Sequence, residues 1–227
     1  MRLRGNYTAN CCLADQSWPF YVRCIGGWSI GLDQQVWHRR SVQPFAVWLK
    51  GFTGEELDSI IAYGENLRQD KATIEDQGRV DVVHDKVRVT RTAWIGHNPQ
   101  TAWIYDKLFR IAYHLNQTIY RLDLTGLSEQ LQYTVYEASE GGHYDWHVDH
   151  STVTPMPRKL SLSLQLSDPA EYEGCGLEMH AANSIETAPL ERGTVIAFPS
   201  YVLHRVAPIL SGRRRSLVAW VSGPLLR

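Results

Sequence analysis

The sequence predicts an α+β fold in which two amphipathic helices precede a long run of short β-strands. Apolar residues recur at helical spacing between residues 54 and 119, and apolar and polar residues alternate in several segments beyond residue 128. Turn-forming pairs such as Asp168-Pro169 and Ser211-Gly212 separate those segments. Short strands at this spacing are typical of a β-sandwich or a β-barrel, so we expect the helices to support a β core.

The length and composition fit one folded domain with an appendage. The chain has 227 residues, of which 44% are hydrophobic, enough for a sizeable core. Its 23 basic residues nearly balance its 24 acidic residues, so no global charge favours binding to nucleic acid or to a membrane surface. Residues 1–43 are expected to be an extension, either folded or partly ordered. Residues 44–227 are expected to form a single domain, with helical support over 44–128 and a β core over 129–223.

The cysteines and the hydropathy pattern predict a cytoplasmic protein. The four cysteines form no Cys-x-x-Cys pair, so neither a structural zinc site nor a disulfide framework is expected: they are Cys11, Cys12, Cys24 and Cys175. No apolar run approaches the roughly 20 residues of a membrane helix. The start of the chain also lacks the apolar stretch of a secretory signal.

Two helices and two strands are expected before residue 128. Phe45 to Leu49 is a short apolar strand, and Thr53 followed by Glu56 is a capping-box pattern that begins a helix over residues 54–68. Residues 87–95 have the composition of a second strand. A second helix over residues 100–119 is indicated by apolar positions that step by four, three and four: Ile104, Leu108, Ile111 and Leu115.

The clearest strand is KLSLSLQLS, which begins at Lys159. Its four leucines share one face, which we expect to enter the core, and Ser161, Ser163 and Gln165 share the opposite face with Lys159. The other strand-like segments of the C-terminal half are LQYTVYEA, HYDWHVDH, GLEMH, TVIAFP, HRVAPI and RRSLVAWVS.

The stretch GGHYDWHVDH contains two overlapping His-x-Asp pairs. One is His143 with Asp145, and the other is His147 with Asp149. On a regular strand all four side chains would point to the same face, so the local pattern alone does not distinguish the two pairs. Such a pair is also common by chance, and a polar strand facing solvent would look the same.

Two distant residues favour a metal site over that alternative. His204 supplies a third ligand, and two histidines with one carboxylate form the facial triad of non-haem Fe(II) oxygenases. Ten residues later, Arg214 shares a strand face with Ser216, Val218 and Trp220, and an arginine directed into a barrel requires an anion. Arg213 and Arg215 lie on the other face, where a solvated surface is expected.

These motifs together resemble the Fe(II)- and 2-oxoglutarate-dependent dioxygenases, specifically the prolyl-hydroxylase-like branch. The resemblance covers about residues 85–223 and includes Tyr136, the stretch GGHYDWHVD, and HRVAPILSGRR with its Gly-x-Arg ten residues after the histidine. It implies a double-stranded β-helix core, also called a jelly-roll or cupin-like fold, supported by N-terminal helices. The family places a tyrosine three residues before the metal histidine; Tyr144 has that place relative to His147.

The resemblance also implies cofactors and site residues. His147, Asp149 and His204 would hold Fe(II), and Arg214 would pair with the far carboxylate of 2-oxoglutarate. O2 is the second cosubstrate, ascorbate is expected to stimulate, and the products would be succinate, CO2 and a hydroxylated substrate. Because Asp149 is retained, hydroxylation is favoured over halogenation. Further cosubstrate contacts are expected from Tyr136, Tyr144, Gln165, Ser216 and Trp220.

Two departures from the family pattern concern local geometry. The stretch from Tyr136 to Gly141 is longer than usual, and Cys175 stands where a second glycine is common. We expect Cys175 to be a small buried residue.

The substrate is less defined. The branch implies a prolyl or other aminoacyl residue in a peptide or protein, while free amino acids, natural-product intermediates and a non-catalytic metal-binding β-barrel remain alternatives. Substrate contacts are expected from Arg88, Arg91 and His150, although ordinary strand and surface positions would explain the two arginines equally well. The near-neutral charge does not support a nucleic-acid substrate.

Overall fold

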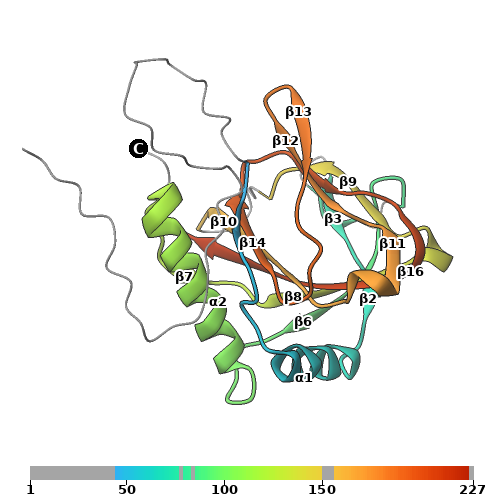
Figure 1. The fold of residues 1–227 in the computed structure, drawn as a ribbon, viewed down its shortest axis with the longest axis horizontal. Helices are drawn as coiled ribbons and strands as arrows, with labels where there is room; N and C mark the ends of the chain where they lie inside the picture. The colour runs from blue at the N-terminus through green and yellow to red at the C-terminus, as the bar shows by residue number, and fades with distance from the viewer. Residues whose placement is uncertain (1–43, 77–78, 83–84, 150–155, 225–227) are drawn as a thin grey trace, which may run out of the picture.

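The structure is a computed structural model that describes residues 44–76, 79–82, 85–149 and 156–224 (Figure 1). The expectations for residues 1–43, including three of the four cysteines, and for His150 lie outside these ranges. No helix within the described ranges is both long and apolar enough to span a membrane.

Most strands belong to one large antiparallel sheet, here called the major sheet. Its main path, in spatial order, is β1 (Ala46–Trp48), β14 (Val195–Pro199), β10 (Arg158–Gln165), β16 (Ile209–Ser222), β8 (Leu131–Glu137), β6 (Arg91–Ile95) and β2 (Asp70–Lys71). Two further strands pair with the long β16: β11 (Tyr172–Gly174) and β7 (Gly126–Leu127).

A second antiparallel sheet, the minor sheet, faces the first. Its order is β13 (Ser184–Thr187), β12 (Leu177–Ala181), β15 (His204–Val206), β9 (His143–His147) and β5 (Arg88–Val89). An apolar cluster between the sheets contains Ile196 and Phe198 of the major sheet and Leu177 and Met179 of the minor sheet. A separate two-stranded pair is formed by β3 (Ile74–Asp76) and β4 (Arg79–Val82). The α+β fold with a jelly-roll core is thus confirmed.

Two helices cover the outer face of the major sheet (Figure 1). Helix α1 (Gly54–Glu65) begins with the predicted capping box, in which Thr53 and Glu56 each bond the other's backbone N–H, and it ends before the predicted residue 68. Helix α2 (Ala102–Leu115) continues into a π-helical turn, Asn116–Tyr120. Short 3₁₀ turns at Ala138–Glu140 and Pro169–Glu171 follow strands of the core.

The alternation of β10 separates the two faces of the major sheet as predicted. Leu160, Leu162 and Leu164 are fully buried against the helices in the same cluster as Leu217 of β16. The opposite face turns toward the minor sheet and carries Ser161, whose side chain contacts the candidate site described below. The helices therefore provide an apolar support that leaves the polar face of the sheet free for chemistry.

The segment from 87 to 95 is not one strand, as the sequence predicted, but two. Arg88 and Val89 pair with β9 in the minor sheet, whereas Arg91–Ile95 pair with β8 in the major sheet. Between them, the Thr90 hydroxyl donates to the Val135 carbonyl at 2.7 Å. The chain thus crosses from one sheet to the other at Thr90, which places Arg88 inside the jelly roll and leaves Arg91 exposed.

The expected solvated surface at Arg213 and Arg215 is wrong. Both guanidinium groups pair with Glu65 at the end of helix α1, and the same carboxylate accepts a 2.8 Å hydrogen bond from the Tyr133 hydroxyl. The prediction failed because the sequence does not reveal which helix end covers that part of the sheet. These contacts join α1 to the major sheet.

We predict that Glu65→Gln destabilises the protein in a pH-dependent manner. Burial alone would raise the pKa of Glu65, but its hydrogen bonds with Arg215, Tyr133 and Gln69 lower it below 4.5. A lowered folded-state pKa stabilises the protein above pH 4.5, and this stabilisation is lost as the pH falls through the folded-state pKa. Urea denaturation should show a deficit of about 1–2 kcal/mol at neutral pH that narrows near pH 3.5. An equal deficit at both pH values would exclude a role for the carboxylate charge.

Candidate metal centre

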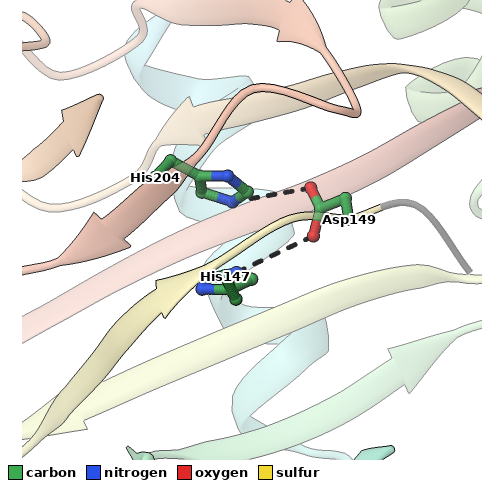
Figure 2. Close-up of side chains that lie close together, drawn as sticks. All are labelled: His147, Asp149 and His204. Carbon is green, nitrogen blue, oxygen red and sulfur yellow. Dashed lines mark ion pairs between the residues drawn. The ribbon is translucent and has the colours of Figure 1, made fainter. Parts of the chain in front are cut away.

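Three side chains from two neighbouring strands of the minor sheet converge inside the jelly roll. His147 ends β9, Asp149 follows two residues later, and His204 begins β15. Their ligand atoms all lie within 4.8 Å of one another. Figure 2 shows the Asp149 carboxylate between the two imidazoles, with Oδ1 at 3.8 Å from His147 Nε2 and Oδ2 at 3.6 Å from His204 Nε2.

A β-bulge in β9 separates the two His-x-Asp pairs. His147 lies opposite His204 and Tyr144 lies opposite Val206, so three steps along β9 match two steps along β15. The extra residue breaks the alternation and brings the Tyr144 ring onto the His147 ring, with centroids 3.5 Å apart and planes 14° apart. The expectation that both pairs share one face is therefore wrong. Asp145 is exposed, and neither it nor His143 belongs to the converging group.

Backbone carbonyls orient both imidazoles toward Asp149. His147 Nδ1 donates to the Asp145 carbonyl at 2.7 Å, and His204 Nδ1 donates to the Val202 carbonyl at 2.9 Å. Since a carbonyl only accepts, each ring must carry its proton on Nδ1 when neutral. Both Nε2 lone pairs are then directed to the centre of the group, as they must be to bind a metal.

The electrostatics of the group also fit a divalent cation. Burial and the neighbouring His204 hold the pKa of His147 far below its usual range. Burial would raise the pKa of Asp149, yet His204, His147 and the Ser161 hydrogen bond lower it. A neutral imidazole and an ionised carboxylate are the protonation states that bind metals. Two nitrogen donors and one oxygen donor suit a first-row metal such as Fe(II).

Two serines that sequence reasoning missed support the carboxylate. The Ser161 hydroxyl donates to Asp149 Oδ2 at 2.7 Å, and its own oxygen lies 2.9 Å from the Ser200 hydroxyl. The Asp149 N–H donates to the Ser200 carbonyl at 2.9 Å. Ser161 was recognisable as an inward position of β10, but its partner required the register between β10 and β14, which no local pattern reveals.

Arg214 lies fully buried on the inner face of β16. Its Nη2 donates to Gln165 Oε1 at 2.8 Å, while Nε and Nη1 have no hydrogen-bond partner, and it forms no ion pair with any described residue. Tyr136, Tyr172 and Cys175 lie close enough to the guanidinium to affect the pKa of Arg214. A buried guanidinium without a counter-ion is costly, so this pocket fits an anionic ligand such as a carboxylate.

Tyr172 joins this pocket although sequence reasoning did not select it. Its hydroxyl is buried, and the Arg214 guanidinium is close enough to oppose the increase that burial causes in the pKa of Tyr172. Strand β11, which carries it, pairs with β16 at Gly212, two residues before Arg214. No local pattern distinguished Tyr172, because its place beside Arg214 depends on the pairing of β11 with β16.

Both predicted departures from the family pattern are accommodated by turns. Cys175 is fully buried, as expected, and adopts a left-handed φ of 54° directly after Gly174, whose φ is 76°. A Cβ on Gly174 would lie only 2.6 Å from the Pro208 carbonyl oxygen, so this position requires glycine. The longer stretch after Tyr136 forms the Ala138–Glu140 turn, which Gly141 ends in the left-handed conformation.

The remaining predicted site residues divide between the interior and the surface. Ser216 is buried on the inner face, between Thr134 and Gln165 in register. Trp220 is buried beside Asp149, whose pKa its side chain helps to lower, and the Arg158 guanidinium lies 3.8 Å from its ring centroid. Arg91 is exposed and pairs with Glu140, away from the converging group.

A jelly roll that encloses two histidines, one carboxylate and a buried arginine with no counter-ion among the described side chains is suited to bind a metal ion and an anionic ligand. Comparison with known proteins agrees. Residues 131–222 match the family model of the 2OG-Fe(II) oxygenase superfamily. The resemblance predicted from the motifs, to the prolyl-hydroxylase-like branch of these oxygenases, is thus confirmed.

Curated relatives match part of the chain. A PKHD-type hydroxylase from Teredinibacter turnerae is 39% identical over 87 residues, which cover 36% of this chain and 38% of that protein. A second, from Prochlorococcus marinus, is 35% identical over 85 residues, covering 37% and 38% respectively. The chain therefore spans less than two fifths of the length of these relatives.

Solved structures show the same fold. A prolyl-4-hydroxylase from Pseudomonas putida superimposes with a TM-score of 0.60 at 18% identity, covering 80% of this chain and 94% of that one. A prolyl hydroxylase from Trichoplax adhaerens, solved with a peptide fragment of hypoxia inducible factor, gives a TM-score of 0.64 at 15% identity, covering 79% and 84%.

We predict that Ser161→Ala weakens metal binding about tenfold or more, because the Asp149 carboxylate loses the hydroxyl that orients it. The measurement is a calorimetric titration of the metal-free protein with Mn(II). Ser163→Ala is the matched control, since Ser163 is buried on the same strand face and makes no bond to Asp149. Equal weakening in both variants would assign the effect to strand packing instead.

Proposed function

We propose that this protein is an Fe(II)- and 2-oxoglutarate-dependent dioxygenase that hydroxylates an unactivated C–H bond while 2-oxoglutarate is converted to succinate and CO2. The observation that carries the proposal is the convergence of His147, Asp149 and His204 within 4.8 Å, inside the segment that matches the oxygenase family. The unpaired Arg214 on the same inner surface supports a dianionic cosubstrate.

Separate groups of residues would bind the metal and the cosubstrate. His147 Nε2, His204 Nε2 and one oxygen of Asp149 would hold the metal on one face and leave positions open for other ligands. The bound iron would supply the chemistry that activates O2. Arg214 would bind the far carboxylate of 2-oxoglutarate, and Gln165 would keep the guanidinium in place.

Tyr136 would act as a neutral hydrogen-bond donor to the cosubstrate. Burial raises the pKa of Tyr136 to about 12, although Arg88 and Arg214 oppose the increase. The phenol therefore keeps its proton at neutral pH and can donate to a carboxylate. Trp220 and Ser216 would form the wall of the same pocket, and ascorbate is expected to stimulate turnover by keeping the iron reduced.

For the substrate, we propose an aminoacyl unit, either a prolyl or other residue of a peptide or the corresponding free amino acid. The Trichoplax neighbour was solved with a peptide fragment, which supports a peptide. The buried cation Arg88 favours a substrate that carries a negative charge. We further propose that the protein works in the cytoplasm and that residues 44–227 form the catalytic domain.

We predict that His204→Ala and Asp149→Ala reduce succinate formation from 2-oxoglutarate at least 100-fold, since two ligands do not hold the ion in a facial site. The assay contains Fe(II), ascorbate and no primary substrate, so it measures uncoupled turnover. His143→Ala is the matched control from the other His-x-Asp pair and should retain wild-type turnover. Full activity in Asp149→Ala would contradict the ligand assignment, and no metal-dependent turnover in the wild type would favour a non-catalytic barrel.

We predict that Arg214→Gln weakens 2-oxoglutarate binding about 10- to 100-fold, which corresponds to about 1.5–3 kcal/mol for a charge-assisted hydrogen bond. The affinity is measured by calorimetry on the Mn(II)-loaded protein. Arg215→Gln removes a neighbouring guanidinium from the opposite face of β16, where it pairs with Glu65, and should leave that affinity unchanged. Unchanged affinity in Arg214→Gln would rule out the anchor.

A further inference from the structure

Arg88 is a second buried arginine inside the jelly roll, and neither the candidate metal centre nor the proposed cosubstrate contacts include it. Arg88 is 8% exposed, and its Nε is buried without a hydrogen-bond partner. Arg88 forms no ion pair with any side chain that the structure describes. Its contacts are with neutral groups: Nη2 donates to Gln132 Oε1 at 2.8 Å, and the guanidinium carbon lies 4.4 Å from the Tyr144 ring centroid.

Arg88 lies close to the candidate metal centre. Arg88 pairs with Tyr144 across strands β5 and β9, and the Tyr144 ring stacks on His147. The guanidinium is therefore separated from a metal-binding imidazole by one aromatic ring. Gln132, its hydrogen-bond partner, belongs to β8 of the major sheet, so Arg88 reaches across the gap between the two sheets.

The other enclosed arginines have acidic partners, whereas Arg88 has no counter-ion among the side chains that the structure describes. Arg158 pairs with Glu129, Arg205 pairs with Glu178, and Arg215 pairs with Glu65, although each of these is less buried than Arg88. An uncompensated charge in the interior is costly, and the neutral partners of Arg88, the Gln132 amide and the Tyr144 side chain, offset only part of that cost. Arg214 is also a buried arginine without a counter-ion among the described side chains. For Arg214, the far carboxylate of 2-oxoglutarate is the proposed counter-ion.

We propose that Arg88 binds a carboxylate of the primary substrate and thereby holds the carbon to be hydroxylated near the metal. The inference rests on the function proposed above and specifies its substrate as an anionic aminoacyl unit. That carboxylate belongs either to a free amino acid or to an acidic side chain in a peptide. A neutral prolyl unit flanked by amide bonds would leave Arg88 without its counter-ion.

An apolar surface next to Arg88 fits the remainder of such a substrate. Trp94 lies opposite Gln132 in the β6–β8 register and is 46% exposed, which is unusual for so large an aromatic side chain. Its ring lies 6.3 Å from that of Trp220, which borders Asp149. The substrate would thus lie between a cation and an indole, a combination that selects a carboxylate attached to an apolar body.

The cosubstrate is the alternative source of the carboxylate, and position argues against it. Arg214 stands on β16 of the major sheet with Gln165, whereas Arg88 belongs to β5 of the minor sheet and contacts Tyr144. If Arg88 bound 2-oxoglutarate, its removal would weaken cosubstrate binding. If it binds the primary substrate, cosubstrate binding survives its removal.

The experiment uses the full chain loaded with metal and has two arms. The first measures 2-oxoglutarate affinity of the Mn(II)-loaded wild type, Arg88→Gln, Arg88→Lys and the control Arg215→Gln. The second measures substrate-stimulated succinate formation with Fe(II) for the twenty free amino acids, their carboxamides, and acetyl- and amide-blocked tripeptides with a central Asp, Glu, Asn, Gln or Pro.

The expected result has three parts. Affinity for 2-oxoglutarate is the same in all four proteins. At least one carboxylate-bearing compound stimulates turnover at least tenfold more than its carboxamide, whether it is a free amino acid or an acidic tripeptide. Arg88→Gln abolishes that preference, Arg88→Lys retains part of it, and Arg215→Gln retains all of it.

Other results overturn the proposal. Stimulation by neutral tripeptides alone, or by no compound in the panel, means that Arg88 does not select a carboxylate. A loss of 2-oxoglutarate affinity in Arg88→Gln assigns the residue to the cosubstrate pocket. Failure of the wild type to bind Mn(II) and 2-oxoglutarate at all would refute the proposed function itself, which the first arm separates from failure of the substrate assignment.

Discussion

The β-bulge in β9 is the constraint on which the candidate site depends. One extra residue between Tyr144 and His147 shifts the alternation of the strand, so that both aromatic rings point inward and stack. The chain then turns, and the Asp149 carboxylate comes between His147 and His204. Without the bulge, His147 and Tyr144 would occupy opposite faces of β9, and the tyrosine ring could not stack on the imidazole.

The surrounding structure holds the three candidate metal ligands and the two buried arginines in fixed positions, which suits the binding of a cation and of anions. The apolar face of the major sheet is covered by helices α1 and α2, so its polar face is available between the sheets. Backbone carbonyls fix the imidazole tautomers, and Ser161 with Ser200 fixes the carboxylate. Two buried arginines face this space from different sheets and have no counter-ion among the described side chains, so anionic ligands would neutralise charge in the interior.

Local periodicity predicted the elements well, because each depends on a short stretch of chain. The capping box at Thr53 and the leucine face of β10 were found where expected. Features that depend on pairing between distant strands were not predictable. The bulge requires the register of β9 against β15, and the division of residues 87–95 requires knowing that Arg88 pairs with one sheet and Arg91 with the other. For the same reason Ser200 and the partners of Arg215 were missed.

The most direct test of this account is a crystal structure of the protein soaked with Mn(II) and 2-oxoglutarate without O2. The account predicts one metal ion bound by His147 Nε2, His204 Nε2 and an Asp149 oxygen, with the far carboxylate of 2-oxoglutarate on the Arg214 guanidinium. It also predicts that the bulge between Tyr144 and His147 is present. A metal ion bound through His143 or Asp145, or a cosubstrate carboxylate away from Arg214, would contradict it.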